Sequence, residues 1–283
     1  MNTSMITALS AMQAFQQKLD MIAGNVANAD TDGYKRKASP FESLLASEMR
    51  QPNPYMLAGR KTPLGLPIEW GVKNGEIRLD LTQGALRETG NPLDLALEGN
   101  ALFEVETNQL DENGLPRRAW TRNGAFRMTP MEFDPDSMQL TTADGYVVMG
   151  IDDAPIIAPR GYSITVSPQG EVIATSKDGS DVVDIRAIKI MTIVGPHLLV
   201  DVGDNLYGVK GGDVAAALQP TDFALLDAQT EPIAVRQGFL EASNVDIAAE
   251  MTDLLQVQRA FQLGSRALSS ADTMMNLANN LRA

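Results

Sequence analysis

The sequence MNTSMITALSAMQAFQQKLDMIAGNVAN occupies residues 1–28 and carries apolar residues at heptad spacing. One heptad column is Met5, Met12, Leu19 and Val26, and the column three residues later is Ala8, Phe15, Ile22 and Ala29. This spacing places a narrow apolar seam along one side of a helix, and such a seam is stable when it meets another helix. The opening segment therefore predicts a helix that needs a helical partner.

The other end of the chain has the same pattern. Its columns are Ile247, Leu254, Phe261, Leu268 and Met275, and Val257, Gly264, Ala271 and Ala278. We expect this helix to begin near Ser243-Asn244-Val245-Asp246, which has the spacing of a capping box, with Glu250 suited to the positive end of the helix dipole. The first helix is expected to start after Thr3 or Ser4. The two seams fit either a stalk within one molecule or packing between neighbouring subunits.

Between the two helices, the sequence predicts first a loop and then a series of strands. Residues 40–75 are rich in proline and glycine and predict an extended connection, with at most one short helix around Phe41 to Met49. From about Val72 to Val235, short alternating runs predict an antiparallel β domain built from hairpins. Turn signals separate these runs at Asp111 to Gly114, Asn123-Gly124, Asp144-Gly145 and Asp178-Gly179.

The predicted fold class is therefore α+β. The N- and C-terminal helices are expected to pair as a coiled-coil-like domain, joined to a central all-β domain by a Pro/Gly-rich loop. The predicted boundaries are 1–34 for the first helix, 35–71 for the connecting loop, 72–237 for the β-rich outer domain and 238–283 for the second helix.

Composition excludes several classes of function. The net charge is −13, nearly all of it in the middle of the chain, so no basic stripe is available for nucleic acid. The only basic run, Lys35 to Lys37, is expected to be a solvated loop. No apolar run approaches the length that spans a bilayer, and the N-terminus lacks the pattern of a cleaved signal peptide. We therefore expect no membrane insertion.

Catalytic and metal-binding patterns are missing. The chain has no cysteine and a single histidine, His197, which predicts a turn or strand-edge residue because the partners of a triad or zinc site are absent. Asp111-Glu112-Asn113-Gly114 lacks the later ligands of a calcium loop. No glycine pattern matches a nucleotide-binding loop. We predict no catalytic residue, no cofactor and no metal, and hence no enzyme.

Several segments resemble the bacterial flagellar rod and hook proteins. At the N-terminus these are Ala8 to Met12, Ile22 to Asn28 and Thr31 to Arg36, and at the C-terminus Gly238 to Asp246 and Gln258 to Phe261. Internal segments agree, namely Gly90 to Gly99, Thr121 to Phe126 and Asp144 to Tyr146. Within this family the chain resembles the distal rod members most, and a second rod subunit type and the hook proteins are the alternatives.

The resemblance implies a structural subunit that assembles helically into the hollow drive shaft between motor and hook. It also implies export through the flagellar type III apparatus without a cleaved signal, location in the extracytoplasmic basal body, and contact with other rod and hook subunits and with surrounding ring proteins. Two other classes stay open from the residues alone: an enzyme acting on the cell wall, and a stand-alone β binding module dimerised by its helices.

The residues expected to carry the function lie on the two helices and just after the first. Candidates for inter-subunit helix packing are Leu9, Met12, Phe15, Leu19, Ile22, Val26, Ile247, Leu254, Val257, Phe261, Leu268 and Met275. Candidates for the helix stop and the start of a bridging loop are Asn25, Asn28, Gly33 and Tyr34.

Overall fold

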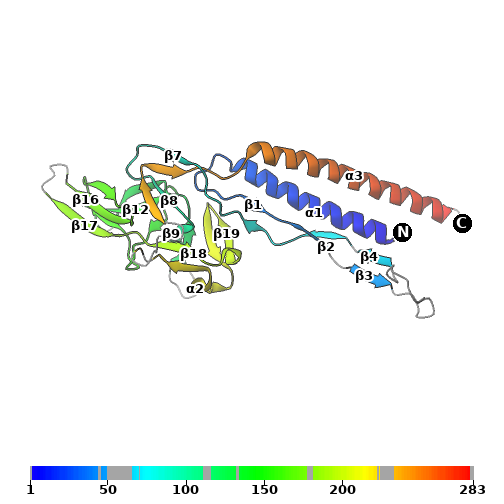
Figure 1. Ribbon diagram of the computed structural model, residues 1–283, viewed down its shortest axis with the longest axis horizontal. Coiled ribbons are helices and arrows are strands. Elements are labelled where there is room, and N and C mark those ends of the chain that lie inside the picture. Colours follow the sequence, from blue (N-terminus) through cyan, green and yellow to red (C-terminus); the bar gives the residue numbers. More distant parts are fainter. Residues whose placement is uncertain are drawn as a thin grey trace, which may run out of the picture. The chain divides into compact units, whose positions relative to one another are not determined.

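The computed structural model describes residues 2–43, 46–49, 66–69, 71–110, 116–131, 134–176, 181–221, 223 and 233–280. A long helix lies at each end of the chain and the middle is rich in strands (Figure 1), so the predicted α+β class is confirmed. The chain divides into two compact units. Unit 1 contains residues 1–27, 37–78 and 246–283, and unit 2 contains residues 28–36 and 79–245.

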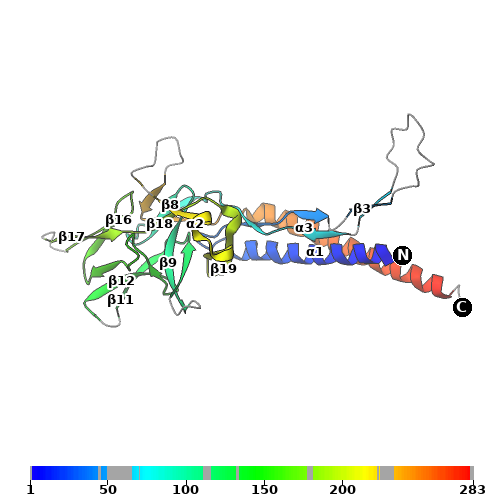
Figure 2. The same ribbon diagram turned by 90° about the horizontal axis from the view of Figure 1, so that it is seen from below.

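Unit 1 is built on the two long helices, α1 (Asn2–Ala27) and α3 (Ile247–Asn280). They lie side by side and run in opposite directions, as both Figure 1 and Figure 2 show. The first helix begins at Asn2, slightly before the expected start. Further strands with at least one residue in this unit are β1 (Lys37–Ala38), β2 (Phe41–Ser43), β3 (Ala46–Met49), β4 (Leu66–Glu69), β5 (Val72–Asn74) and β6 (Arg78–Leu79).

The prediction of a short helix around Phe41 to Met49 is wrong. That segment forms β2 and β3, which pair antiparallel with β5 and β4. Phe41 lies opposite Asn74, and its ring meets the Phe15 ring of α1 edge-on at 5.8 Å between centroids. Backbone pairing with a strand some 30 residues away decided this conformation, and local sequence does not report it. The proline-rich residues 50–65 lie outside the described residues.

The start of α3 also differs from the expectation. Asp246 is the capping residue, because its Oδ1 accepts hydrogen bonds from the backbone N–H groups of Ala248 and Ala249. Ser243, predicted to begin a capping box, instead accepts from the N–H of Val245 within the preceding turn. The box was placed three residues too early because two candidate caps precede the same apolar run.

Unit 2 is an antiparallel β structure whose main sheet has the order β11-β12-β13-β9-β10-β20-β19, with β14 paired to β12, and β18 to β9 and β21. A three-stranded sheet has the order β15-β16-β17, and β8 pairs with β22 and β7 with β23. The bounds are β7 Leu86–Glu88, β8 Leu95–Glu98, β9 Ala101–Leu110, β10 Pro116–Thr121, β11 Phe126–Pro130, β12 Ser137–Thr142, β13 Val147–Val148, β14 Ile157–Pro159, β15 Ser163–Val166, β16 Glu171–Thr175, β17 Val182–Ala187, β18 Ile190–Ile193, β19 Leu199–Gly203, β20 Leu206–Val209, β21 Leu218–Pro220, β22 Ala234–Gln237 and β23 Phe239–Glu241, with the short helix α2 at Val214–Ala217.

The core of unit 2 is apolar and fills the space between these sheets. Phe103 of β9 and Phe126 of β11 are fully buried and meet edge-on at 5.1 Å between ring centroids. The predicted turns at Asn123-Gly124 and Asp144-Gly145 separate strands as expected, whereas those at Asp111 to Gly114 and at Asp178-Gly179 lie outside the described residues. His197 is exposed in the 3-10 turn Pro196–Leu198.

Candidate functional site: the terminal helix pair and the adjoining segments

The seam between α1 and α3 contains the heptad positions of both helices. On α3, burial recurs at three- and four-residue steps, and the half-buried or buried members are Leu254, Val257, Phe261, Gly264, Leu268, Ala271 and Met275. On α1 the corresponding members are Ala8, Met12, Phe15, Leu19, Ile22 and Val26. A Cβ carbon placed on Gly264 would lie 3.2 Å from Met12 Cγ, so the glycine allows the helices to approach closely there.

Two of the predicted packing residues lie outside this seam. The side chain of Leu9 is 51% exposed and that of Ile247 is 47% exposed. Ile22 and Val257 are buried, and the remaining candidates are half-buried. Two helices cover each other along one side only, so the edges of the seam stay accessible. Packing between subunits by these residues therefore stays a prediction.

A polar pair lies inside the helix pair. Asn25 is fully buried, and Glu250 is 1% exposed. Asn25 Nδ2 donates to Glu250 Oε2 (3.3 Å) and to the backbone oxygen of Lys37 (2.9 Å), and Asn25 Oδ1 accepts from the N–H of Lys37 (3.0 Å). A buried polar contact in an apolar seam favours one register, because a slipped helix would leave both groups without this partner.

A second face of α1 packs on the strands of unit 1. Asn74 of β5 donates from Nδ2 to the backbone oxygen of Ala14 (2.9 Å), and Lys18 Nζ donates to the backbone oxygen of Ser39 (3.0 Å). Ala14 is buried at this face. The first helix is thus held on two sides, by α3 and by the 37–78 segment.

The candidates for the helix stop lie in different environments. Asn25 is inside α1, whereas Asn28, Gly33 and Tyr34 follow its end. Asn28 accepts at its backbone oxygen from the N–H of Thr31 (3.2 Å), which closes a turn. Tyr34 is buried. Their role in a bridging loop stays a prediction.

Gly33 makes a close backbone approach. Its φ is 74°, its N–H donates to the backbone oxygen of Glu241 (2.7 Å), and an added Cβ would lie 2.6 Å from the backbone nitrogen of Asn123. Only glycine fits this combination of left-handed backbone and contact without a shift. The segment after α1 is therefore packed against distant parts of unit 2.

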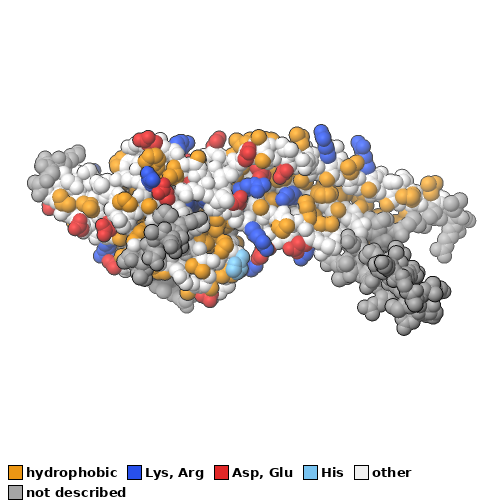
Figure 3. Space-filling model, in the orientation of Figure 1, with side chains coloured by type: hydrophobic (Ala, Val, Ile, Leu, Met, Phe, Trp, Pro, Cys, Tyr) orange, Lys and Arg blue, Asp and Glu red, His pale blue; other side chains and the backbone are white. Residues whose placement is uncertain are grey.

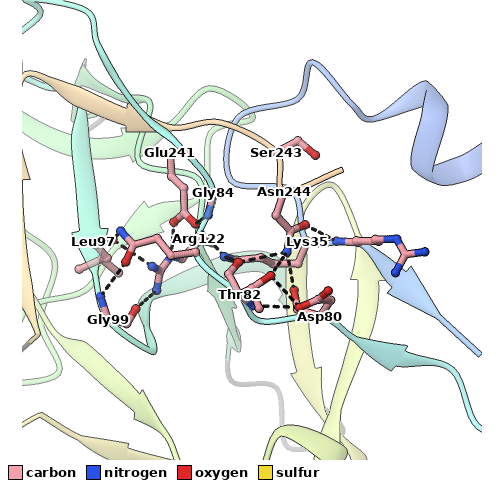
Figure 4. Close-up of polar contacts among 12 residues, drawn as sticks. Lys35, Asp80, Thr82, Gly84, Leu97, Gly99, Arg122, Glu241, Ser243 and Asn244 are labelled. Carbon is pink, nitrogen blue, oxygen red and sulfur yellow. Dashed lines mark hydrogen bonds and ion pairs between the residues drawn. The ribbon is translucent and has the colours of Figure 1, made fainter. Parts of the chain in front are cut away.

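Figure 4 shows a buried charge cluster that joins three parts of unit 2. Lys35 Nζ donates to Glu241 Oε1 (2.7 Å), and Arg122 Nε donates to Glu241 Oε2 (2.5 Å). All three side chains are at most 3% exposed. The expectation that Lys35 belongs to a solvated loop is therefore wrong. We call Lys35, Arg122 and Glu241 the buried cluster.

The remaining polar atoms of the buried cluster also have partners. Lys35 Nζ donates to the backbone oxygen of Thr82, the N–H of Gly84 donates to Glu241 Oε1, and Arg122 donates to the backbone oxygens of Leu97, Gly99 and Ala101. Next to it, Asn244 accepts from the N–H of Arg36 and donates to the backbone oxygens of Asp80 and Thr82. These bonds hold residues 35–36 against residues 241–244.

The electrostatics of the cluster keep its carboxylate ionised. Burial alone would raise the pKa of Glu241, but the charges of Arg122 and Lys35, with their hydrogen bonds, outweigh burial and hold the pKa below its ordinary value. Burial lowers the pKa of Lys35, and the Glu241 carboxylate opposes that shift. A buried ion pair with these additional bonds fixes one geometry, and removal of one partner leaves an uncompensated buried charge.

Sequence reasoning missed this cluster. Its members are 119 and 206 residues apart along the chain, and no spacing rule links them. The signal that was available is that each lies in a segment of the family resemblance: Lys35 in Thr31 to Arg36, Arg122 in Thr121 to Phe126 and Glu241 in Gly238 to Asp246.

Comparisons with known proteins match the parts just described. The family model "Flagella basal body rod protein" matches residues 5–35, and "Flagellar basal body rod FlgEFG protein C-terminal" matches residues 236–281. The flagellar hook-basal body complex protein FlhP of Bacillus subtilis is 33% identical over 99% of both chains. The chain belongs to the flagellar basal-body rod protein family. The flagellar basal-body rod proteins FlgG of Agrobacterium fabrum and Borreliella burgdorferi are 32% and 29% identical and also align over nearly their full lengths.

The two segments that match the rod family models contain the helix pair and two members of the buried cluster. Residues 5–35 cover most of α1 and reach Lys35, and residues 236–281 begin before Glu241 and include α3. Rod family members are structural flagellar proteins. No helix in the described part of this rod family chain combines the length and apolar character needed to cross a membrane.

Proposed function

We propose that this chain is a structural subunit of the flagellar basal-body rod that assembles helically into the drive shaft between motor and hook. The observation that carries the proposal is similarity along nearly the whole chain to proteins named as flagellar rod proteins. The paired terminal helices support it, because they are the segments that the rod family models match.

In this proposal the terminal helices form the inner, coiled-coil-like domain and unit 2 faces outward. The α1 and α3 seams are half-buried along much of their length, so helices from neighbouring subunits can cover the open edges with Met12, Phe15, Leu19, Leu254, Phe261 and Leu268. Many such contacts add up to the stiffness that torque transmission requires. The predicted domain boundaries and the bridging role of the loop that follows Tyr34 belong to the same proposal.

The partners we propose are further copies of the chain, other rod and hook subunits, surrounding ring proteins and the flagellar type III export apparatus. Export without a cleaved signal is part of the proposal. The distal rod is the subtype we favour, because several relatives are named FlgG. Another relative is named a flagellar hook-basal body complex protein, so a second rod subunit type and a hook protein stay as alternatives.

Electron microscopy of basal bodies from a strain that lacks this gene tests the function. We expect a rod that stops short of the hook, and we expect the gene on a plasmid to restore the missing part. If the deletion strain builds a complete rod and hook, the chain is not a rod subunit. The level at which the rod stops separates the distal from the proximal subtype, and a complete rod without a hook identifies a hook protein.

A biochemical test separates the rod subunit from a β binding module dimerised by its helices. Analytical ultracentrifugation of the purified chain is expected to show monomer or long polymer. A stable small oligomer whose size does not change with concentration would favour the binding module.

A further inference from the structure

The segment from Leu79 to Gln83 uses its backbone for hydrogen bonds on one side only. The N–H of Asp80 donates to the backbone oxygen of Arg36 (2.8 Å). Asn244 Nδ2 donates to the backbone oxygens of Asp80 (2.8 Å) and Thr82 (3.0 Å), as Figure 4 shows. The even-numbered residues of the segment therefore direct their backbone carbonyl groups toward Asn244.

Leu81 and Gln83 have no such backbone partners. Neither their N–H nor their C=O groups form a hydrogen bond with any residue that the structure describes. In an extended chain the backbone groups of successive residues point to opposite sides, so these groups face away from Asn244. The segment continues β6 (Arg78–Leu79). It therefore presents the open edge of a strand, and an open edge is a template for pairing with another strand.

A cleft of about 780 Å³ lies along this open edge. Its lining consists of the consecutive residues 79–83 on one side and of Glu98, Gly99, Asn100 and Pro196 on the other. The side chain of Gln83 links the two walls, because its Nε2 donates to the backbone oxygen of Leu97 (3.2 Å) and its Oε1 accepts from the N–H of Gly99 (3.3 Å). All of these residues belong to unit 2, so the cleft is built within one compact unit.

The two faces of the segment differ in chemistry. Leu79 and Leu81 share one face, because side chains alternate in an extended chain, and both pack against a buried apolar cluster of unit 2. Asp80 lies on the opposite face. Its carboxylate and that of Glu98 line the cleft, and no basic side chain is among the described residues of the lining. Glu98 also pairs with the exposed side chain of Arg236 (2.9 Å). The cleft therefore offers an apolar strip and two carboxylates beside an open strand edge.

We propose that this cleft binds an extended segment of a different protein in which apolar and basic residues alternate. The segment pairs with the backbone groups of Leu81 and Gln83 as an added strand, and this pairing supplies affinity. Its apolar side chains lie on Leu79 and Leu81, and its basic side chains lie near Asp80 on the opposite face, which supplies selectivity. The proposal names a partner surface on unit 2 and does not depend on the rod function.

The charge of the chain favours a different protein over a second copy as the occupant. The net charge is −13, and Figure 3 shows acidic side chains next to hydrophobic ones on the visible face of unit 2. Charges of opposite sign speed association and select partners, whereas like charges oppose association. Another copy would bring mostly acidic surface to the two carboxylates of the cleft, while a basic segment complements them.

Binding of a synthetic peptide to the purified full-length chain tests the proposal. The probe is a fluorescently labelled Val-Lys-Val-Lys-Val peptide with blocked ends, and the control is the same peptide with glutamate in place of lysine. Fluorescence anisotropy is expected to show saturable binding of the lysine peptide and binding about tenfold weaker for the glutamate peptide. Amide exchange at Leu81 and Gln83 is expected to slow when the lysine peptide binds. No saturable binding, equal binding of the two peptides, or unchanged exchange at both residues would overturn the proposal.

Removal of the two charges tests which part of unit 2 binds the peptide. Asp80→Asn combined with Glu98→Gln neutralises both carboxylates and keeps an oxygen for the hydrogen bonds that each one accepts. We expect this double variant to bind the lysine peptide about tenfold more weakly than the wild-type chain. The matched control is Glu171→Gln with Asp184→Asn, which changes the charge equally at exposed positions outside the cleft and should bind like the wild type. Equal binding by the two double variants contradicts the assignment of the cleft. Circular dichroism checks that both variants fold.

Strand addition is tested by two N-methylated forms of the lysine peptide. One is methylated on its valine amides and the other on its lysine amides, so each form blocks one edge of the added strand. Only one edge meets Leu81 and Gln83, so one form is expected to bind about tenfold more weakly than the other. Equal binding by the two forms contradicts strand addition. Slow amide exchange at both residues in the concentrated chain without peptide would show that a second copy fills the cleft, and would overturn the proposal of a basic partner. All of these measurements use the purified chain, so a negative result leaves the rod function standing.

Discussion

Met12 of α1 faces Gly264 of α3 so closely that a Cβ carbon on residue 264 would lie 3.2 Å from Met12 Cγ. The contact lies near the middle of the helix pair, and it requires a glycine or a small residue at position 264. By contrast, Gly24 of α1 has no atom within 4 Å of an added Cβ carbon. The two helical glycines therefore separate the effect of helix propensity from the effect of helix packing.

Gly264→Leu is expected to destabilise the helix pair by about 1–3 kcal/mol, because a bulky side chain overpacks the seam. Gly24→Ala is expected to stabilise the same helices by about 1 kcal/mol, since the gain in helix propensity meets no contact. Thermal unfolding followed by circular dichroism at the helical band measures both. If Gly264→Leu unfolded at the same temperature as the wild-type protein, that result would contradict the close approach of the two helices at residue 264.

Asn25→Ala is expected to cost about 1–3 kcal/mol, because it removes a donor from the buried carboxylate of Glu250. A double-mutant cycle with Glu250→Gln measures how much of that cost is the pair itself, and an interaction energy of at least about 0.5 kcal/mol is expected. Asn276→Ala is the control, because Asn276 is exposed on α3 and its bond to Asp272 is long. It should leave the free energy of unfolding within about 0.5 kcal/mol of the wild-type value.

Phe261→Asp is expected to abolish rod assembly while unit 2 stays folded, because it places a charge in the half-buried seam. Motility on soft agar and electron microscopy of basal bodies measure assembly, and near-ultraviolet circular dichroism reports on the tertiary packing of unit 2. Gln262→Asp is the matched control, since residue 262 is exposed. A motile strain with Phe261→Asp would show that the seam is not required.

Glu241→Gln is expected to destabilise unit 2 by about 3–5 kcal/mol at pH 7, because Lys35 and Arg122 then lie buried without a carboxylate. The folded-state pKa of Glu241 is lowered, so its contribution is fully present above its ordinary value of 4.5 and is lost as pH falls through the lower folded value. The difference between the two proteins should therefore shrink on acidification below pH 4.5. Urea unfolding from pH 7 to pH 3 measures it, and a difference that stays constant over this range would contradict the assignment.

The sequence predicted the helices well because their evidence is local and repeated. The seven-residue spacing of Leu254, Phe261 and Leu268 describes one surface of one helix, and in the structure those residues are half-buried on α3, which packs on α1. Short alternating runs and turn residues predicted the strands of unit 2 for the same reason. Local periodicity cannot show which neighbouring subunit, if any, completes the seam.

Features set by distant pairing were not predictable. The segment from Phe41 became strand because β5 pairs with it, and the expected solvated Lys35 became buried because Glu241 and Arg122 surround it. The start of α3 was misplaced because Ser243 and Asp246 are both good capping residues, and only the hydrogen bonds distinguish them. A single sequence does not show any of these long-range contacts.

Lys35 and Glu241 are 206 residues apart along the chain, and this separation also sets the order in which the protein can finish folding. When the chain emerges from a ribosome or a narrow channel starting at one end, Lys35 and Glu241 cannot meet until almost the whole of unit 2 has emerged. The closure of so long a loop is slow and comes late, because entropy opposes it until the intervening contacts have formed. The ion pairs of the buried cluster are thus among the last contacts to form. Until the segment that contains Glu241 has emerged, Lys35 and Arg122 have no carboxylate partner there.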